Sequence, residues 1–224
     1  IQEQEQKRKI ELKALQSQIN PHFLYNTLDT MASIAEIRNC PEVSHMSQSL
    51  ALIFRYSLNM KNPFSTVEHE IAHLKNYTYV MDMRMHDNIQ YTFDVDETTL
   101  KSKLPRLSLQ PIVENAINHG LRNKRGKKKI GIQIKRKQMD LVICIEDNGI
   151  GMDTSAINES LSKNELDFVE KGNSIGLHNI NARLKMLYGN TYGMYLESTL
   201  GEGTKVFMIL PDSGEDSSNE EKDI

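Results

Sequence analysis

The 224-residue chain carries a net charge of −3, from 27 basic and 30 acidic side chains, so it lacks the broad positive field of a dedicated nucleic-acid-binding protein. We therefore expect no nucleic-acid partner. No apolar run approaches the roughly 18 residues of a membrane span, so we also expect no membrane contact by this segment. The two cysteines, Cys40 and Cys144, are too few and too far apart for a disulfide framework or a metal cluster, which is typical of a reducing, cytoplasmic location.

The first segment, residues 1–39, is predicted to be helical because its apolar residues recur at spacings of three and four. Pro21 interrupts this helix, since proline removes a backbone donor and crowds the preceding turn. Beyond the proline the apolar stripe continues in a new phase, through Leu24, Leu28, Met31 and Ala35. His22, Asn26 and Asp29 form a separate polar line, so we expect the imidazole of His22 to be exposed.

A turn at residues 39–41 leads into a second predicted helix, which ends near Asn62. Its apolar stripe consists of Val43, Met46, Leu50 and Ile53. Two helices joined by a short turn make a hairpin, and this hairpin has few large apolar residues. Because it would bury too little surface alone, we expect it to pair with a second copy into a four-helix bundle. Residues 1–62 are therefore predicted to be a dimerisation hairpin, and the protein a homodimer.

The next segment, residues 63–211, is predicted to be a separate α+β domain with helices layered on a mostly antiparallel sheet. The predicted helices are Val67–Met85, Leu107–Gly120 and Ile175–Leu187. The predicted strands are Ile89–Val95, Ile130–Ile134, Leu141–Ile145, Tyr192–Glu197 and Lys205–Leu210. Residues 152–172 are predicted to form a long functional loop. The acidic, serine-rich residues 212–224 are predicted to be a disordered tail.

The first chemical motif in this domain is Glu114-Asn115-Ala116-Ile117-Asn118-His119. On a helix, Asn115, Asn118 and His119 share one face, because they lie three and four residues apart. Neutral carboxamide oxygens suit a magnesium ion that already carries phosphate and water ligands.

The second motif, Asp147-Asn148-Gly149-Ile150-Gly151-Met152, follows an apolar predicted strand directly. Asp147 is thus expected at the end of that strand, where its carboxylate can accept a hydrogen bond from the exocyclic amine of adenine. Gly149 and Gly151 allow the backbone to approach a ligand closely.

Two further glycine motifs follow in the same domain. Gly172-Asn173-Ser174-Ile175-Gly176-Leu177 opens a predicted helix, whose free amide groups suit phosphates. Gly201-Glu202-Gly203-Thr204 is a tight turn into the last predicted strand. Each motif is weak alone, but the four together, in this order and on the expected elements, indicate a nucleotide site.

The four motifs resemble the N, G1, G2 and G3 boxes of the ATP-binding fold shared by gyrase, Hsp90, MutL and histidine kinases. The run from Leu15 to Leu28, with Asn20-Pro21-His22-Phe23 at its centre, resembles the phosphoacceptor box of LytS/YesM-type sensor histidine kinases. The resemblance covers about residues 13–210 and implies a two-layer α/β sandwich of the Bergerat type. It also implies that ATP with Mg²⁺ phosphorylates His22 and that the phosphoryl group passes to an aspartate of a response-regulator receiver domain.

The resemblance assigns roles to individual residues. His22 would be the phosphoacceptor, Asn115 would hold magnesium and Asp147 would bind adenine. The complete nucleotide-binding set implied is Asn115, Asn118, His119, Asp147, Gly149, Gly151, Gly172, Gly176, Leu177, Gly203 and Thr204. The loop after Met152 would be a lid over the nucleotide.

The residues around His22 give an independent expectation of the chemistry. An exposed imidazole is mostly neutral and nucleophilic near pH 7, so positioning would supply most of the catalysis. Asn26, one helical turn further on, is predicted to orient the imidazole and is our second catalytic candidate; Asp29 is the nearest carboxylate. Two positions depart from the family pattern. Ser174 replaces a glycine of the G2 box, and Phe23 replaces the acidic residue that usually follows the phosphoacceptor, which leaves the general base unassigned.

Three alternatives remain open at this point. The chain would be a gyrase- or Hsp90-like conformational ATPase if no histidine is modified, or an ATP-sensing dimer module without histidine phosphorylation. His69-Glu70-Ile71-Ala72-His73 matches the H-E-x-x-H pattern of zinc metallopeptidases, although both histidines are expected to face solvent. Because the chain starts at Ile1 inside a charged helical run and has this resemblance, we expect it to be the cytoplasmic domain of a longer cell-membrane protein.

Overall fold

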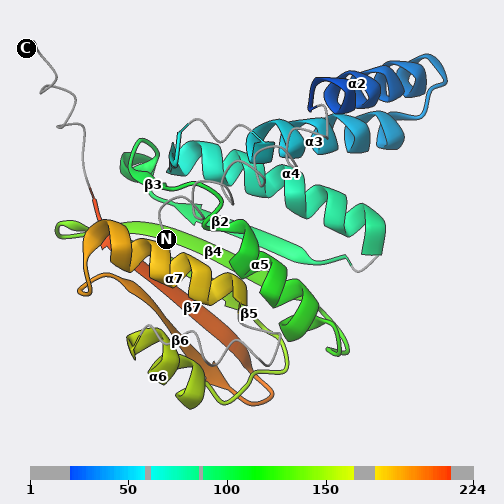
Figure 1. The fold of residues 1–224 in the computed structure, drawn as a ribbon. Coiled ribbons are helices and arrows are strands. Elements are labelled where there is room, and N and C mark those ends of the chain that lie inside the picture. Colours follow the sequence, from blue (N-terminus) through cyan, green and yellow to red (C-terminus); the bar gives the residue numbers. More distant parts are fainter. Residues whose placement is uncertain (1–20, 59–61, 86–87, 164–174, 213–224) are drawn as a thin grey trace, which may run out of the picture. The chain divides into compact units, whose positions relative to one another are not determined.

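The computed structural model describes residues 21–58, 62–85, 88–163 and 175–212 (Figure 1). The chain divides into two compact units. The first comprises the described part of residues 1–61 together with residues 75–84, and the second comprises the described parts of residues 62–74 and 85–224. No helix in these described ranges is both long enough and apolar enough to cross a bilayer.

The first unit contains the predicted hairpin, formed by α2 (Pro21–Ile37) and α3 (Pro41–Leu58). The two helices pack through small side chains, which let their backbones approach closely: Ala32, Ala35, Ser44, Ser47 and Ala51 are buried. Met31 and Val43, which lie on the predicted apolar stripes, are 50% and 55% exposed, so the stripes are only partly buried within the hairpin. The serines of α3 fill the contact between the helices and leave larger side chains outside.

The second unit is built on a five-stranded sheet in the order β2-β4-β5-β7-β6. Its strands are β2 (Gln90–Val95), β4 (Lys129–Lys137), β5 (Asp140–Asp147), β6 (Gly193–Thr199) and β7 (Gly203–Pro211). Strands β2 and β4 are parallel, and the other neighbours are antiparallel. A separate antiparallel pair, β1 (Phe64–Thr66) and β3 (Lys103–Pro105), was not predicted.

Helix α4 (Val67–Met85) begins in this unit, and its residues 75–84 belong to the first unit. The other helices of the second unit are α5 (Gln110–Asn115), α6 (Ser155–Lys163) and α7 (Ile175–Tyr188), with a short 3₁₀ turn η1 (Glu97–Thr99). Helix α5 continues directly into a π-helical turn, η2 (Ala116–Leu121). Figure 1 shows α5, α6 and α7 on one face of the sheet, and alternate strand residues such as Ile132, Ile145 and Val206 are buried beneath them. The two-layer α/β sandwich is therefore confirmed.

Two predicted helix boundaries are wrong. The helix expected from Leu107 begins only at Gln110, because Leu107 adopts a left-handed conformation with φ of 57°. The helix expected to stop at Gly120 runs on to Leu121 as the π-helical turn. Gly120 does not have a positive φ, so its lack of a side chain serves another purpose.

Part of the predicted long loop is the helix α6. Asp153 begins it by accepting a hydrogen bond from the amide of Ser155 at 2.9 Å. Asn158 then joins it to β6, donating to the carbonyl of Leu196 and accepting from its amide, both at 2.8 Å. Hydrogen bonds of polar side chains thus anchor this helix at its start and to the sheet. The rest of the predicted loop, from residue 164 to Gly172, lies outside the described residues, as does Ser174 of the third motif.

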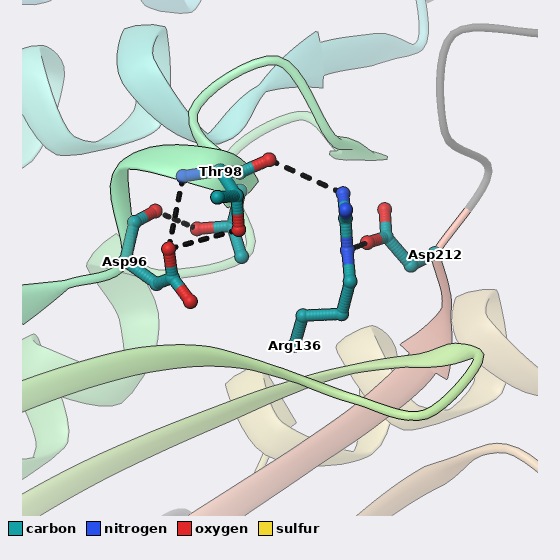
Figure 2. Close-up of polar contacts among 5 residues, drawn as sticks. Asp96, Thr98, Arg136 and Asp212 are labelled. Atoms are coloured by element: carbon teal, nitrogen blue, oxygen red, sulfur yellow. Dashed lines mark hydrogen bonds and ion pairs between the residues drawn. The ribbon is translucent and has the colours of Figure 1, made fainter.

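The end of β7 is fastened to the sheet by an ion pair (Figure 2). The guanidinium of Arg136 pairs with the carboxylate of Asp212, whose side chain is only 3% exposed, and donates to the carbonyl of Thr98 at 3.2 Å. Asp96 accepts from the amide and hydroxyl of Thr98 at 2.9 and 2.8 Å. Asp212, which we expected to begin the tail, is thus an ordered part of the sandwich. The remainder of that tail lies outside the described residues.

Candidate nucleotide-binding site

A cavity of about 740 Å³ lies in the second unit, at the positions of the predicted motifs. Seven of the predicted nucleotide-binding residues line it: Asn115, Asn118, His119, Asp147, Gly151, Leu177 and Thr204. Gly149, Gly176 and Gly203 do not line it, and Gly172 is not among the described residues. The structure therefore brings residues from η2, β5, α7 and β7 to one place, although they are separated by up to 89 positions in sequence.

Most of the remaining cavity wall is apolar. It includes Ile112, Ile145, Ile150, Leu196 and Val206. A pocket with apolar walls and few polar groups is the usual environment for a flat heterocycle such as a purine, which is held by apolar contact and selected by one or two hydrogen bonds.

Asp147 is the acidic side chain of this wall. It ends β5, it is 7% exposed, and its Oδ1 accepts a hydrogen bond from the amide of Gly149 at 2.7 Å. Burial raises the pKa of Asp147 to about 6, against the opposing effect of the amides of Gly149 and Thr204. The carboxylate is therefore ionised at neutral pH and can accept a hydrogen bond from a ligand.

Three glycines are needed because the backbone passes very close to Asp147. A Cβ at Gly120 would lie 2.7 Å from Asp147 Oδ1, and a Cβ at Gly149 would lie 2.2 Å from the carbonyl oxygen of Gly120. Gly203, with φ of 131°, has room for no side chain either, since a Cβ would lie 2.0 Å from the carbonyl oxygen of Asp147. Two of these glycines, Gly149 and Gly203, thus support the acidic residue without lining the cavity.

Asn115 stands where α5 changes into the π-helical turn. Such turns occur often at functional sites, because they displace one residue from the regular helix. The amide nitrogen of Asn115 is buried and makes no hydrogen bond within the described parts of the chain. This side chain is therefore available to a ligand in the cavity.

The polar residues of the cavity suit a magnesium ion only if the ion is already bound to phosphate groups. The described residues contain no group of three or more His, Cys, Asp or Glu side chains that would hold a metal ion. Magnesium bound to ATP keeps phosphate and water ligands and needs only one or two oxygens from the protein. The carboxamide of Asn115 fits that requirement.

Sequence reasoning missed two polar residues of the cavity wall, Arg122 and Asn123. Their position just after the first motif was the available signal, because a helix that places one wall residue tends to place the next turn nearby.

His22 lies on α2, in the first unit, and is exposed as predicted. Its Nδ1 lies 3.1 Å from the side-chain nitrogen Nδ2 of Asn26, at hydrogen-bonding distance. Asp29, the nearest carboxylate in sequence, instead lies 3.8 Å from the guanidinium of Arg55. Asn26 therefore contacts the imidazole, whereas Asp29 forms an ion pair with Arg55.

The H-E-x-x-H sequence does not form a zinc site. His69 is exposed, but His73 is buried, so the expectation that both histidines face solvent is wrong for His73. The ring of His73 is hydrogen-bonded to the amide oxygen of Gln110 at 2.6 Å, and the Glu70 carboxylate is bound by backbone amides. The position of the apolar stripe did not predict this burial, because His73 and Glu70 are buried by hydrogen-bond partners at residues 107–110.

Comparison with known proteins decides the family. Residues 10–89 match the histidine kinase family, and residues 103–214 match the histidine kinase-, DNA gyrase B- and HSP90-like ATPase family. The chain belongs to the histidine kinases. This membership confirms the predicted resemblance, and for this histidine kinase it implies ATP binding by the second unit.

Several sensor kinases resemble this histidine kinase along most of its length. It is 35% identical to sensor histidine kinase YesM of Bacillus subtilis, over 91% of this chain and 34% of that protein. It is 34% identical to sensor histidine kinase YpdA of Escherichia coli, over 92% of this chain and 35% of that protein. Sensor protein LytS of Oceanobacillus iheyensis is 32% identical, over 91% and 35%. The chain spans about a third of the length of these relatives.

Among solved structures, the catalytic domain of histidine kinase ThkA resembles the chain with a TM-score of 0.49 and 16% identity. The match covers 66% of this chain and 97% of that domain.

Proposed function

We propose that this kinase core uses ATP with Mg²⁺ to phosphorylate His22 and then passes the phosphoryl group to an aspartate of a response-regulator receiver domain. The observation that carries the proposal is the contact between His22 and Asn26, in a chain that also has the cavity around Asp147. An exposed imidazole that is oriented by a neighbouring side chain suits a phosphoacceptor.

Asn26 determines which ring nitrogen reacts. An asparagine can present either its oxygen or its nitrogen to a neighbour, because the two ends have nearly the same shape. In the structure Nδ2 of Asn26 faces Nδ1. When the carboxamide is turned over, its oxygen accepts from the Nδ1–H of His22, the lone pair is left on Nε2, and Nε2 becomes the nucleophile. Attack by this lone pair requires no prior removal of a proton, so the acidic neighbour that Phe23 replaces is not needed for this step.

In the proposed transfer, Nε2 of His22 forms a bond to the γ-phosphorus of ATP. The bond from that phosphorus to the β,γ-bridging oxygen breaks, so ADP leaves with the electron pair. The ring acquires positive charge, which the Asn26 oxygen stabilises at Nδ1–H. The Nδ1 proton is afterwards lost to water, which gives neutral phosphohistidine.

The nucleotide would be held by two groups of residues. Asp147 would accept from the adenine amine, between the apolar walls of the cavity. Asn115 would supply the carboxamide oxygen that holds magnesium, and Asn118, His119 and the start of α7 at Gly176 and Leu177 would face the phosphates. Magnesium, when bound with ATP, neutralises the charge of the β- and γ-phosphates.

We also propose that the kinase acts as a homodimer. The hairpin leaves a row of large apolar side chains exposed on α2: Phe23, Met31, Ile34 and Ile37 are 50–78% exposed. A second hairpin would cover such a row in a four-helix bundle. Because the relatives are sensor proteins about three times as long, we propose that the chain is the cytoplasmic kinase part of a membrane-bound sensor.

The test is to incubate the protein with γ-labelled ATP and Mg²⁺ at neutral pH and to map the label by mass spectrometry. We expect an acid-labile phosphoryl group on His22. His22→Gln should lose the label and keep its affinity for ATP, and the exposed His69→Gln should retain both. A label that survives in His22→Gln, or ATP hydrolysis with no labelled protein, would overturn the proposal; the second result would favour a conformational ATPase.

A further inference from the structure

The carboxylate of Glu70, on α4, binds three consecutive backbone amides. Its Oε1 accepts from the amide of Leu107 at 2.8 Å, and its Oε2 accepts from the amides of Ser108 at 3.0 Å and Leu109 at 3.3 Å. Glu70 is only 1% exposed. A buried carboxylate is stable only where such donors replace its water, so this contact is a specific one.

The bound segment is the turn that begins α5. Leu107 has a left-handed φ of 57°, which is uncommon for a residue with a side chain and persists only where surrounding contacts hold it. Gln110, the first residue of α5, is in turn held by His73, one helical turn after Glu70 on α4, at 2.6 Å. Burial lowers the pKa of His73, so the ring is neutral in this contact. Helix α4 therefore fixes the turn and the helix start at two successive points.

The same turn is tied to α7. The hydroxyl of Ser108 accepts a hydrogen bond from the guanidinium of Arg183, on α7, at 2.9 Å, and donates to the carbonyl of Pro105 at 2.5 Å. Ser108 is fully buried. Glu70 and Ser108 thus connect α4, the turn before α5, and α7 in one buried polar network.

Helices α5 and α7, which this network holds, both reach the cavity. Helix α5 leads directly to Asn115, and α7 contributes Leu177 near its first residue. The two helices also touch near the cavity, since a Cβ at Gly176 would lie 3.5 Å from the side chain of Pro111. The proposed adenine side, by contrast, is formed by Asp147 and Thr204 on strands β5 and β7, and none of the hydrogen bonds described above ends on either residue.

We infer that Glu70 is a positioning residue for the phosphate side of the nucleotide site, acting through the turn at 107–109 and through Ser108 and Arg183. The inference rests on the proposed assignment of Asn115 and the start of α7 to the phosphates. Its consequence is selective: loss of the Glu70 charge should weaken the binding of a triphosphate and spare the binding of a nucleoside.

The experiment compares two ligands on the full chain by isothermal titration calorimetry. The ligands are a non-hydrolysable ATP analogue with Mg²⁺ and adenosine alone. In Glu70→Gln, the NH₂ group of the new side chain cannot accept hydrogen bonds from the backbone N–H groups that the carboxylate binds. We therefore expect the Kd of the analogue to rise about tenfold and the Kd of adenosine to change less than about twofold. Glu68→Gln, the same change at an exposed position on α4, should alter neither constant.

Ser108→Ala provides a second variant in case Glu70→Gln fails to fold. It removes the link to Arg183, leaves the three amide bonds to Glu70 in place, and should raise the Kd of the analogue about threefold with adenosine unaffected. An equal loss of affinity for both ligands, or no change for either, in the folded variants would overturn the inference. A wild-type chain that binds adenosine but not the analogue would instead overturn the phosphate assignments on which it rests.

Discussion

Gly120 and Asp147 approach each other so closely that a single methyl group on Gly120 would lie 2.7 Å from Oδ1 and 2.9 Å from Cγ of the aspartate. The first residue lies in the π-helical turn and the second at the end of a strand. This contact joins the motif that carries Asn115 to the motif that carries the acidic group. It explains the glycine at 120, which the sequence pattern had suggested to be a helix stop.

We predict that Gly120→Ala weakens ATP binding about tenfold, because the added methyl group displaces the Asp147 carboxylate from its hydrogen bond with Gly149. Gly131→Ala is the matched control, since the nearest atom to its new Cβ is the Thr92 hydroxyl at 3.4 Å. Calorimetric titration with ATP and Mg²⁺ measures both. Equal affinities of the two variants would show that the aspartate can move without loss.

The raised pKa of Asp147 predicts a pH dependence of nucleotide affinity. Only the ionised carboxylate accepts freely from the adenine amine, and burial raises its pKa to about 6. Affinity for adenosine should therefore be constant above about pH 7 and fall as the pH decreases through 6. Asp147→Asn should bind adenosine weakly at every pH and show no such titration. A wild-type affinity that is flat from pH 5 to pH 8 would contradict this role.

The same burial predicts the opposite effect on stability. The folded protein holds the Asp147 proton more tightly than the unfolded chain does, so the stability that this group contributes is present below its ordinary pKa of 3.8 and is lost as the pH rises through about 6. The loss at pH 7 corresponds to about 3 kcal/mol. We therefore expect Asp147→Asn to unfold at higher urea concentration than the wild type at pH 7 and to show no advantage near pH 4. An advantage that does not depend on pH would have another cause.

The sequence predicted the sandwich and the cavity residues well, because both depend on local patterns. Strands such as Ile130–Ile134 and Leu141–Ile145 alternate or run apolar between turns, and Asp147 follows one of them immediately. The motif residues then meet wherever the sheet brings the ends of β5 and β7 together. Family resemblance supplied the order of the motifs, and the structure supplied the contact between Gly120 and Asp147.

Other features depend on contacts distant in sequence and could not be predicted from it. Helix α6 is anchored by the bonds of Asn158 to β6, 38 positions away, and its polar sequence resembles a loop. His73 is buried by Gln110, 37 positions away, although its place on α4 suggested an exposed side chain. A helical stripe describes apolar burial only, and a polar side chain that is buried by its hydrogen-bond partner lies outside that description.

Asn26 should affect the rate of phosphorylation and not the binding of ATP. Asn26→Ala removes the side chain that contacts His22 Nδ1 and that, in the proposed mechanism, selects the reactive tautomer. We therefore expect kcat to fall about tenfold with the KM for ATP unchanged. Both residues are exposed, so the substitution should cost little stability. Ser33→Ala, which removes another exposed hydrogen-bonding side chain of α2, is the control. Initial rates of labelling measure the effect, and an unchanged kcat for Asn26→Ala would dismiss the tautomer argument.

The exposed apolar row of the hairpin predicts a dimer that a charge can disrupt. Ile34 is 54% exposed on α2, and burying a glutamate at this position in a bundle carries a large desolvation cost. Ile34→Glu should therefore be monomeric at concentrations where the wild type is a dimer, by analytical ultracentrifugation. Met139→Glu, at a 79% exposed position between β4 and β5, should remain dimeric. A monomeric wild type at all concentrations would refute the proposed bundle.

The ion pair between Arg136 and Asp212 predicts a stabilising role for the end of β7 (Figure 2). The Asp212 side chain is 3% exposed and that of Arg136 is 40% exposed, so solvent screens the pair only partly. Asp212→Asn should lower the free energy of unfolding by about 1–2 kcal/mol, measured by urea unfolding. The pair of Lys135 and Asp94 is the internal control: its atoms lie 2.9 Å apart, but both side chains are more than half exposed. Asp94→Asn should therefore cost less than about 0.5 kcal/mol, and an equal effect of the two substitutions would mean that burial does not strengthen the Arg136 pair.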